Sequence, residues 1–154
     1  MQEPHRGSRR TTAVFLRSAL ATMAVDSPDR YADLVRYLNG APGRYRVDDD
    51  IFTVAVVDGE VAVAAAHGGG PMPVRVDTTA RAVLSLVDGT ASLVELLARE
   101  ELMVRANADA LLSLNAAVRT FARSAIGSST LRERYEEYRT WVLRRRSSDA
   151  GSRD

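Results

Sequence analysis

The chain has 154 residues, 45% of them hydrophobic, and a formal net charge of +1, which favours one compact domain and provides no strong field to attract nucleic acid or an anionic membrane. Because the chain contains no cysteine, disulfides, thiolate nucleophiles and thiolate metal sites are excluded. All 21 basic residues are arginine, so no lysine is available to form a Schiff base.

Two amphipathic helices are predicted near the start of the chain. Apolar residues recur at helical spacing from Phe15 to Met23. A second stripe follows Ser27-Pro28, which indicates a cap with proline at the first helical position, and it ends at Asn39-Gly40. Arg17 interrupts the first apolar run, and no run approaches the ~20 residues of a transmembrane helix. We therefore expect no export signal, no integral membrane segment and a cytoplasmic location.

A β-hairpin is predicted in the middle of the chain. The run from Phe52 to Val57 is followed by Asp58-Gly59 and then by the run from Glu60 to His67, a pattern typical of antiparallel strands joined by a tight turn. Side chains alternate along a strand, so one face of this hairpin is apolar and needs a cover. It carries Phe52, Val54, Val56, Val61, Val63 and Ala65.

The elements after the hairpin alternate between short strands and helices. We expect a strand at Val74–Val76, a helix capped within Asp77-Thr78-Thr79 and ending at Asp88-Gly89, a helical turn from Ser92, a strand at Leu102–Ala106, a long helix capped by Asn107, and a final helix from Leu131 to Arg146. This order predicts an α+β domain in which helices both precede and follow the hairpin along the chain.

Two polar motifs fail the tests for ligand-binding loops. Asp48-Asp49-Asp50 lacks the spacing and the closing glutamate of a calcium loop, so it predicts a solvated hairpin turn. Gly68-Gly69-Gly70 is followed neither by Lys-Ser/Thr nor by the start of a helix, so it predicts a flexible loop rather than a phosphate site. A metal site is not expected either, because His67 is the one histidine outside the N-terminal segment.

The order of elements resembles the sterol carrier protein 2-like (SCP2-like) domains. The resemblance is carried by the hairpin from Tyr45 to His67, by Val74–Thr79, by Leu86–Ser92 and by Leu102–Leu112. It implies an α+β fold in which helices cover one face of a five-stranded, mostly antiparallel sheet. It also implies an apolar tunnel for a fatty acyl chain, a sterol or another lipid-like molecule.

The candidate ligand-binding residues lie on the apolar face of the hairpin and on the helices expected to cover it. They are Phe52, Val54, Val61, Val63, Val83, Leu86, Leu111, Leu114, Phe121 and Trp141. His67 is the candidate for proton transfer, because strand alternation directs it to the side of Val61 and Val63. The alternative is an exposed histidine at a strand end.

Two functions follow from such a cavity. The first is a carrier or sensor that binds a hydrophobic small molecule by desolvation. The second is a cofactor-free cyclase or isomerase of a natural-product pathway, and a regulatory module also stays open. We expect no cofactor and no nucleic-acid partner, and the oligomeric state is not defined by the sequence.

The chain is expected to divide into four segments. Residues 1–10 and 147–154 are predicted to be disordered tails, 11–127 form the SCP2-like domain, and 128–146 form a helix packed on that domain. The apolar stripe of this last helix either packs on the domain or forms one wall of the cavity, in which case Tyr138 or Trp141 contacts the ligand.

Overall fold

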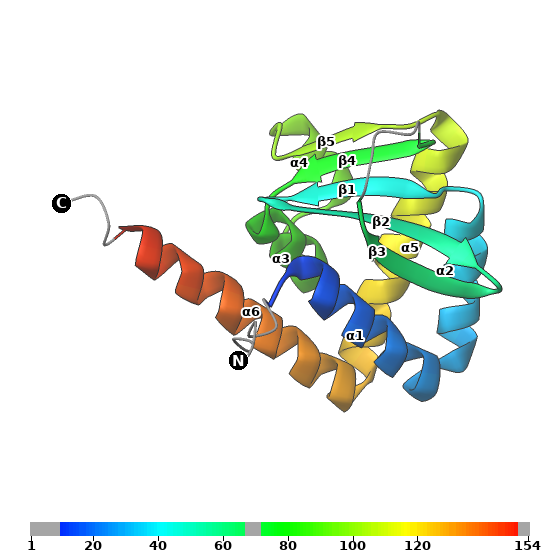
Figure 1. Cartoon of the computed structure of the whole chain (residues 1–154), viewed down its shortest axis with the longest axis horizontal. Helices are drawn as coiled ribbons and strands as arrows, with labels where there is room; N and C mark the ends of the chain where they lie inside the picture. Colours follow the sequence, from blue (N-terminus) through cyan, green and yellow to red (C-terminus); the bar gives the residue numbers. More distant parts are fainter. Residues whose placement is uncertain (1–9, 67–71, 151–154) are drawn as a thin grey trace, which may run out of the picture.

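The structure is a computed structural model that describes residues 10–66 and 72–150 (Figure 1). The elements in these ranges are α1 (Thr12–Asp26), α2 (Pro28–Asn39), β1 (Gly43–Val47), β2 (Asp50–Val57), β3 (Glu60–Ala65), β4 (Val74–Thr78), α3 (Ala80–Asp88), α4 (Leu93–Ala98), β5 (Leu102–Arg105), α5 (Ala108–Gly127) and α6 (Ser129–Ala150). The α+β class predicted from the sequence is confirmed.

The strands form one open sheet in the order β3-β2-β1-β4-β5. β1 and β4 are parallel, and the other neighbouring pairs are antiparallel. The mostly antiparallel five-stranded sheet is therefore confirmed. The single parallel pair arises because the chain leaves β3 at one edge of the sheet and returns beside β1.

The β2–β3 hairpin forms as predicted. Asp58 and Gly59 have φ angles of 51° and 78°, and a type I′ turn requires positive φ at both central residues. The register places Val54 opposite Val63 and Val56 opposite Val61. The apolar side chains of both strands therefore lie on the same face of the sheet.

Side-chain caps begin three helices at positions that the sequence indicates, whereas Ser27, before α2, makes no side-chain cap hydrogen bond. Thr79, Ser92 and Asn107 each accept a hydrogen bond from the backbone N–H three residues later, at 3.1, 3.1 and 2.8 Å. Pro28 opens α2, and Gly89 ends α3 in the left-handed region with φ of 73°. These local signals explain why the helices begin and end at these residues.

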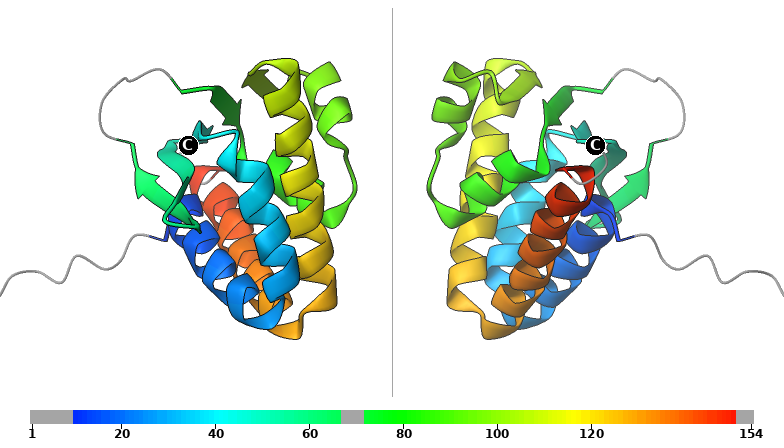
Figure 2. Two further views of the ribbon diagram at one scale, coloured as in Figure 1. Left: turned by 90° about the vertical axis from the view of Figure 1, so that its right-hand side faces the viewer. Right: turned by 90° about the vertical axis from the view of Figure 1, so that its left-hand side faces the viewer.

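Helices cover only one face of the sheet. Figure 2 shows α2 and α5 behind the strands and α1 and α6 beside them below the sheet, and the opposite face of the sheet is turned toward the viewer in Figure 1. Phe52, Val54 and Val63 are buried beneath α1 and α2, and a second apolar cluster around Val74 and Leu96 fills the space under α3, α4 and α5.

The Asp48-Asp49-Asp50 turn, which the sequence predicts only as a solvated turn, also caps two helices. The Oδ2 atom of Asp50 accepts a hydrogen bond from the backbone N–H of Ala13 at 2.8 Å, and that of Asp48 accepts one from Ala80 at 3.3 Å. Both donors lie in the first turn of a helix, where backbone N–H groups lack partners and carry partial positive charge. The β1–β2 turn therefore ties α1 and α3 to the sheet.

The last helix, α6, runs to Ala150 and so extends four residues into the segment predicted to be a tail. Leu131, Tyr135, Tyr138 and Val142 are buried, at spacings of four, three and four residues. This stripe packs against α1, α3 and α5. The helix continues beyond Arg146 because no proline or glycine interrupts the sequence before Gly151.

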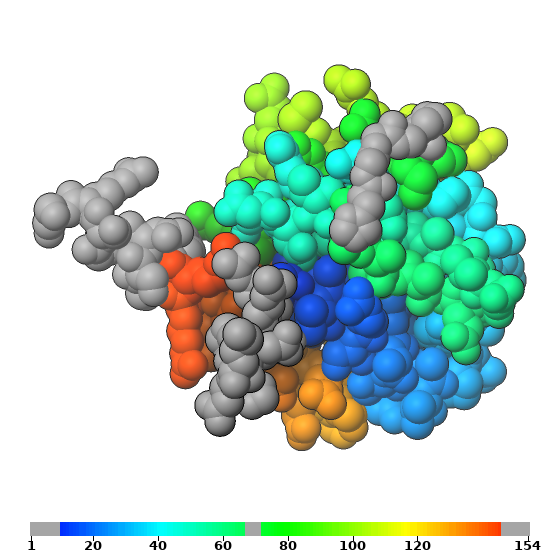
Figure 3. Space-filling view, viewed as in Figure 1, coloured from blue at the N-terminus to red at the C-terminus, as the bar shows by residue number. Residues whose placement is uncertain are grey.

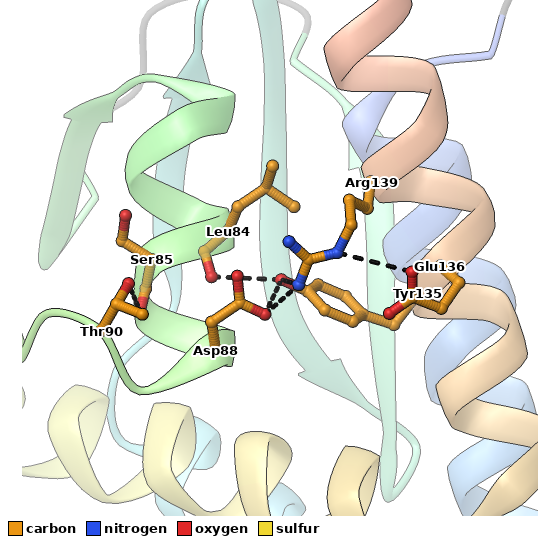
Figure 4. A network of polar contacts seen from close by, with 7 residues as sticks. All are labelled: Leu84, Ser85, Asp88, Thr90, Tyr135, Glu136 and Arg139. Atoms are coloured by element: carbon orange, nitrogen blue, oxygen red, sulfur yellow. Dashed lines mark hydrogen bonds and ion pairs between the residues drawn. The ribbon is translucent and has the colours of Figure 1, made fainter.

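A polar network fixes α6 to the end of α3 (Figure 4). The Tyr135 hydroxyl lies 2.9 Å from Oδ1 of Asp88 and 3.1 Å from the Leu84 carbonyl oxygen. Arg139 forms an ion pair with the same carboxylate, and its guanidinium lies 5.1 Å from the centroid of the Tyr135 ring. Burial and the hydrogen bond to Asp88 both raise the pKa of Tyr135.

Candidate functional site

An apolar cavity of about 190 Å³ lies between the helices and the covered face of the sheet. Side chains from α1, α2, α3, α4 and α5 and from all five strands surround it. The lining residues are Thr12, Phe15, Leu16, Leu20, Leu34, Leu38, Tyr45, Val47, Phe52, Val54, Val61, Val76, Thr78, Val83, Leu86, Val87, Leu93, Leu102, Leu114, Ala117, Val118 and Phe121. Apolar groups dominate the surface that a bound molecule would contact.

Most of the predicted ligand-binding residues meet at this cavity. The sheet contributes Phe52, Val54 and Val61, and the helices contribute Val83, Leu86, Leu114 and Phe121. His67, the predicted proton-transfer residue, lies outside the described residues. The remaining three predicted residues are Val63, Leu111 and Trp141, and the structure places them elsewhere.

Val63 and Leu111 pack in the core beside the cavity. β3 is an edge strand directly under α1, so the Val63 side chain fills the α1–β3 contact. Its carbonyl oxygen accepts hydrogen bonds from Nε and Nη2 of Arg17 at 3.2 and 2.9 Å. Leu111 lies near the start of α5 and packs against the second apolar cluster. Hydrophobic patterning identified both as inward-facing but could not resolve which pocket of the interior each one fills.

Trp141 is separated from the cavity by Tyr138. Phe15 lines the cavity and stacks on Tyr138 with ring centroids 4.3 Å apart, and Tyr138 in turn stacks on Trp141 at 5.7 Å. On its outer side the indole is covered by the guanidinium of Arg145, 4.8 Å from the ring centroid. The aromatic residues of α6 thus support the wall of the cavity without forming it.

The sequence reasoning missed the contribution of the first two helices. Leu16 and Leu20 of α1 and Leu34 and Leu38 of α2 line the cavity. All four belong to the same apolar stripes that predict these helices, so the signal was present in the sequence. Periodicity does not predict the angle at which a helix crosses the sheet. This angle decides which apolar residues of the helix border the cavity.

Three lining residues carry hydroxyl groups, and two of these hydroxyls are already paired. The Thr12 Oγ1 and Tyr138 hydroxyl oxygens lie 3.0 Å apart, and Thr78 donates a hydrogen bond to the Glu101 carbonyl oxygen at 3.0 Å. Tyr45 is different, because its hydroxyl makes no hydrogen bond to any described residue. Burial raises the pKa of Tyr45 to about 12, so the phenol is neutral near pH 7.

Gly43 allows the Tyr45 ring to lie along its own strand. A Cβ atom at position 43 would stand 2.8 Å from Cε2 and 3.1 Å from the hydroxyl oxygen of Tyr45, closer than van der Waals contact permits. The ring also stacks on Phe52 with centroids 5.8 Å apart. Every fully enclosed polar side-chain atom in the described residues has a hydrogen-bond partner, so the unpaired Tyr45 hydroxyl is not sealed inside the core.

Two other classes of site receive no support from the described residues. Among them, no group of three or more His, Cys, Asp or Glu side chains is close enough together to hold a metal ion. No helix within the described ranges is both long enough and apolar enough to cross a membrane.

Comparisons with known proteins give a clear result for the fold. No family model and no curated protein matches the sequence. Among solved structures, the UbiJ-SCP2 ubiquinone synthesis protein has a TM-score of 0.58 at 19% identity, covering 79% of this chain and 97% of that one. The sterol carrier protein domain 2 of Helicoverpa armigera has a TM-score of 0.55 at 14% identity, covering 71% of this chain and 87% of its own.

A third structure, sterol carrier protein 2 from Yarrowia lipolytica in its apo form, has a TM-score of 0.52 at 15% identity and covers 73% of this chain and 88% of its own. All three TM-scores lie above 0.5, and the matches cover most of each chain. The chain therefore has the SCP2-like fold that its order of elements predicts.

Proposed function

We propose that this protein binds a lipid-like small molecule in the cavity between the sheet and the helices, as a carrier or a sensor. The observation that carries the proposal is the composition of the wall: apolar side chains form almost the whole surface of the space. Such a site binds through desolvation of apolar surface and orients its ligand through a few polar groups.

The polar end of the ligand is expected to meet Tyr45. A neutral phenol both donates and accepts hydrogen bonds, so it suits a carboxyl, hydroxyl or carbonyl group. The names of the similar solved structures refer to ubiquinone synthesis and to sterol carriage. Quinones with isoprenoid tails and sterols share this combination of a large apolar body with one small polar end.

The alternative function, a cofactor-free cyclase or isomerase, lacks support from the described lining. Proton transfer in such an enzyme needs a positioned acid or base, and the described residues around the cavity include no carboxylate and no imidazole. His67 is the residue that would keep this alternative open. His67→Ala is expected to leave ligand affinity unchanged, whereas a loss of turnover in this variant would favour the enzyme.

Uptake of a fluorescent fatty acid, followed by its emission on transfer from water to an apolar site, tests the proposal. The protein is expected to bind it saturably, and Ala117→Leu is expected to weaken binding at least tenfold by filling the cavity. Ala98→Leu makes the same change on the exposed surface of α4 and should bind like the wild type. Equal binding by all three proteins would place the probe outside the cavity and contradict the proposal.

A further inference from the structure

The open face of the sheet carries an arginine cluster that the proposed function does not use. Arg44 and Arg46 of β1, Arg75 of β4 and Arg105 of β5 lie on the face opposite the cavity, the one turned toward the viewer in Figure 1 and Figure 3. Four guanidinium groups on one face stand out in a chain whose net charge is +1.

The strand register aligns three of these arginines in one row. Arg44 lies directly opposite Arg75, and Arg75 lies directly opposite Arg105. Residues directly opposite one another in a sheet have Cβ atoms about 5 Å apart, and like charges at this distance destabilise the pair. The fold therefore accepts an electrostatic cost at the antiparallel pair of Arg75 and Arg105.

In the neighbouring row, an arginine lies opposite an aspartate instead of another arginine, so the repulsion is absent. Arg46 lies opposite Asp77, forms an ion pair with it, and has its pKa raised by that hydrogen bond. Arg75 and Arg105 have no carboxylate partner among the described residues, and both are exposed. Arg46 is neutralised within the protein, whereas Arg75 and Arg105 are left for an external anion to neutralise.

The row lies in a concave part of the surface. The four arginines border a groove of about 630 Å³, together with Asp77 and the apolar side chains of Ile51, Leu97 and Met103. A groove of this size holds a small charged molecule or a head group with part of its apolar tail. The apolar walls lower the local dielectric and strengthen charge–charge attraction above the row.

We propose that the row of Arg44, Arg75 and Arg105 is a binding site for a phosphate-bearing anion. The planar guanidinium fork matches phosphate oxygens with paired hydrogen bonds, and neighbouring strands place several forks within reach of one phosphate or diphosphate. The anion is either a free phosphorylated molecule or the head group of a phospholipid. The site lies on the opposite side of the sheet from the cavity, so it is independent of the proposed ligand.

Thermal unfolding in a buffer of low anion content tests the cost that the row imposes. Replacing Arg75 and Arg105 together by threonine removes the repulsion and retains residues suited to strands, so the melting temperature is expected to rise by about 1–3 °C. Arg119→Thr on the exposed surface of α5 is the matched control and should not raise it. An unchanged or lowered melting temperature in the double variant would show that the row is not strained and would overturn the premise.

Pyrophosphate is the probe for the site itself. At about 100 times its dissociation constant it should raise the melting temperature of the wild type and of Arg119→Thr by about 5 °C or more. The R75T/R105T variant should show no rise beyond that produced by sodium chloride at the same ionic strength. An equal rise in all three proteins would overturn the proposal.

Vesicle co-sedimentation separates the two sources of phosphate. Binding to phosphatidylglycerol vesicles but not to phosphatidylcholine vesicles, displaced by pyrophosphate and lost in R75T/R105T, assigns the site to a lipid head group. A pyrophosphate response without vesicle binding assigns it to a free phosphorylated molecule, and the absence of both overturns the proposal. Fatty-acid uptake by R75T/R105T should equal that of the wild type, so a failure here is distinct from a failure of the cavity proposal.

Discussion

Tyr45 combines features that rarely occur together in a hydrophobic wall. Its ring stacks on Phe52 and lies close to Gly43, where a Cβ atom would collide with it. Its hydroxyl has no partner among the described residues. The hydroxyl is therefore available to pair with the polar end of a ligand.

Replacing Tyr45 by phenylalanine is expected to weaken binding of a fatty acid by roughly 2- to 10-fold, which corresponds to the loss of one hydrogen bond. The fold should be retained, since no protein hydrogen bond is removed. Displacement of a fluorescent fatty acid measures the change, and Tyr37→Phe, at a half-buried position outside the cavity lining, is the control. A ligand-binding constant that is identical in both variants would mean that the hydroxyl does not contact the ligand.

Buried tyrosines also predict how stability depends on alkaline pH. Burial raises the pKa of Tyr45 and of Tyr138 to about 12, compared with an ordinary value near ~10 in the unfolded chain. The folded state therefore disfavours the phenolate, and the stability present below about pH 10 is lost as the pH rises toward about 12. With no lysine or cysteine in the chain, the tyrosines dominate the titration in this window.

We expect the free energy of unfolding to fall between about pH 10 and about pH 12, with Tyr138 contributing a loss of about 2 kcal/mol. Urea unfolding at a series of pH values measures it. Tyr138→Phe should flatten the curve relative to that of the wild type. A curve for Tyr138→Phe as steep as that of the wild type would contradict the assignment.

At the level of elements, α6 is tied to α3 by one carboxylate. Asp88 accepts a hydrogen bond from Tyr135 and pairs with Arg139, and its side chain is 23% exposed. Asp88→Asn removes the charge that both partners face. The free energy of unfolding should fall by about 1–2 kcal/mol, as expected for a partly buried charge-assisted contact.

Asp33→Asn is the comparison for this change. Asp33 pairs with Arg36 within α2 at 3.1 Å, and its side chain is 49% exposed, so screening by water and salt should limit the loss to about 0.5 kcal/mol or less. Denaturant unfolding of both variants gives the two values. Equal losses would mean that the Asp88 network does not stabilise the α3–α6 contact.

The elements were largely predictable because their signals are local. Asp58-Gly59 sets the hairpin, and Thr79, Ser92 and Asn107 begin helices through contacts three residues away. Contacts between distant parts of the chain carry no such signal. The capping of α1 and α3 by Asp50 and Asp48 joins residues 37 and 32 positions apart, so the sequence alone predicts only a solvated turn there.

At the level of the whole molecule, the sequence predicts the apolar face that borders the candidate site but does not predict the cavity itself. Strand alternation and helical stripes identified Phe52, Val54, Leu114 and Phe121 as inward-facing, and all four line the cavity. The same rules could not separate them from Val63, which fills a contact between α1 and β3. Whether an inward-facing side chain borders a space depends on how the helices cross the sheet.

The size of the cavity predicts which ligands fit without rearrangement. Its volume of about 190 Å³ lies below the ~300 Å³ at which ligand pockets usually begin, so a short acyl chain fits and a sterol requires the helices to move apart. Affinity for a series of fatty acids should rise about fourfold per methylene group until the chain fills the cavity, and then level off. Competition against a fluorescent fatty acid measures the series, and affinity independent of length would contradict apolar burial.

The most direct test of the central claim is to fill the cavity and to measure ligand uptake and stability in the same protein. Ala117 is buried on α5 and lines the space, so Ala117→Leu adds apolar atoms where the ligand is expected; Val83→Leu on α3 makes a smaller addition if the first change disturbs packing. A melting temperature at or above that of the wild type, together with at least a tenfold loss of fatty-acid affinity, is the predicted result. A folded variant of either kind that binds with wild-type affinity would contradict it.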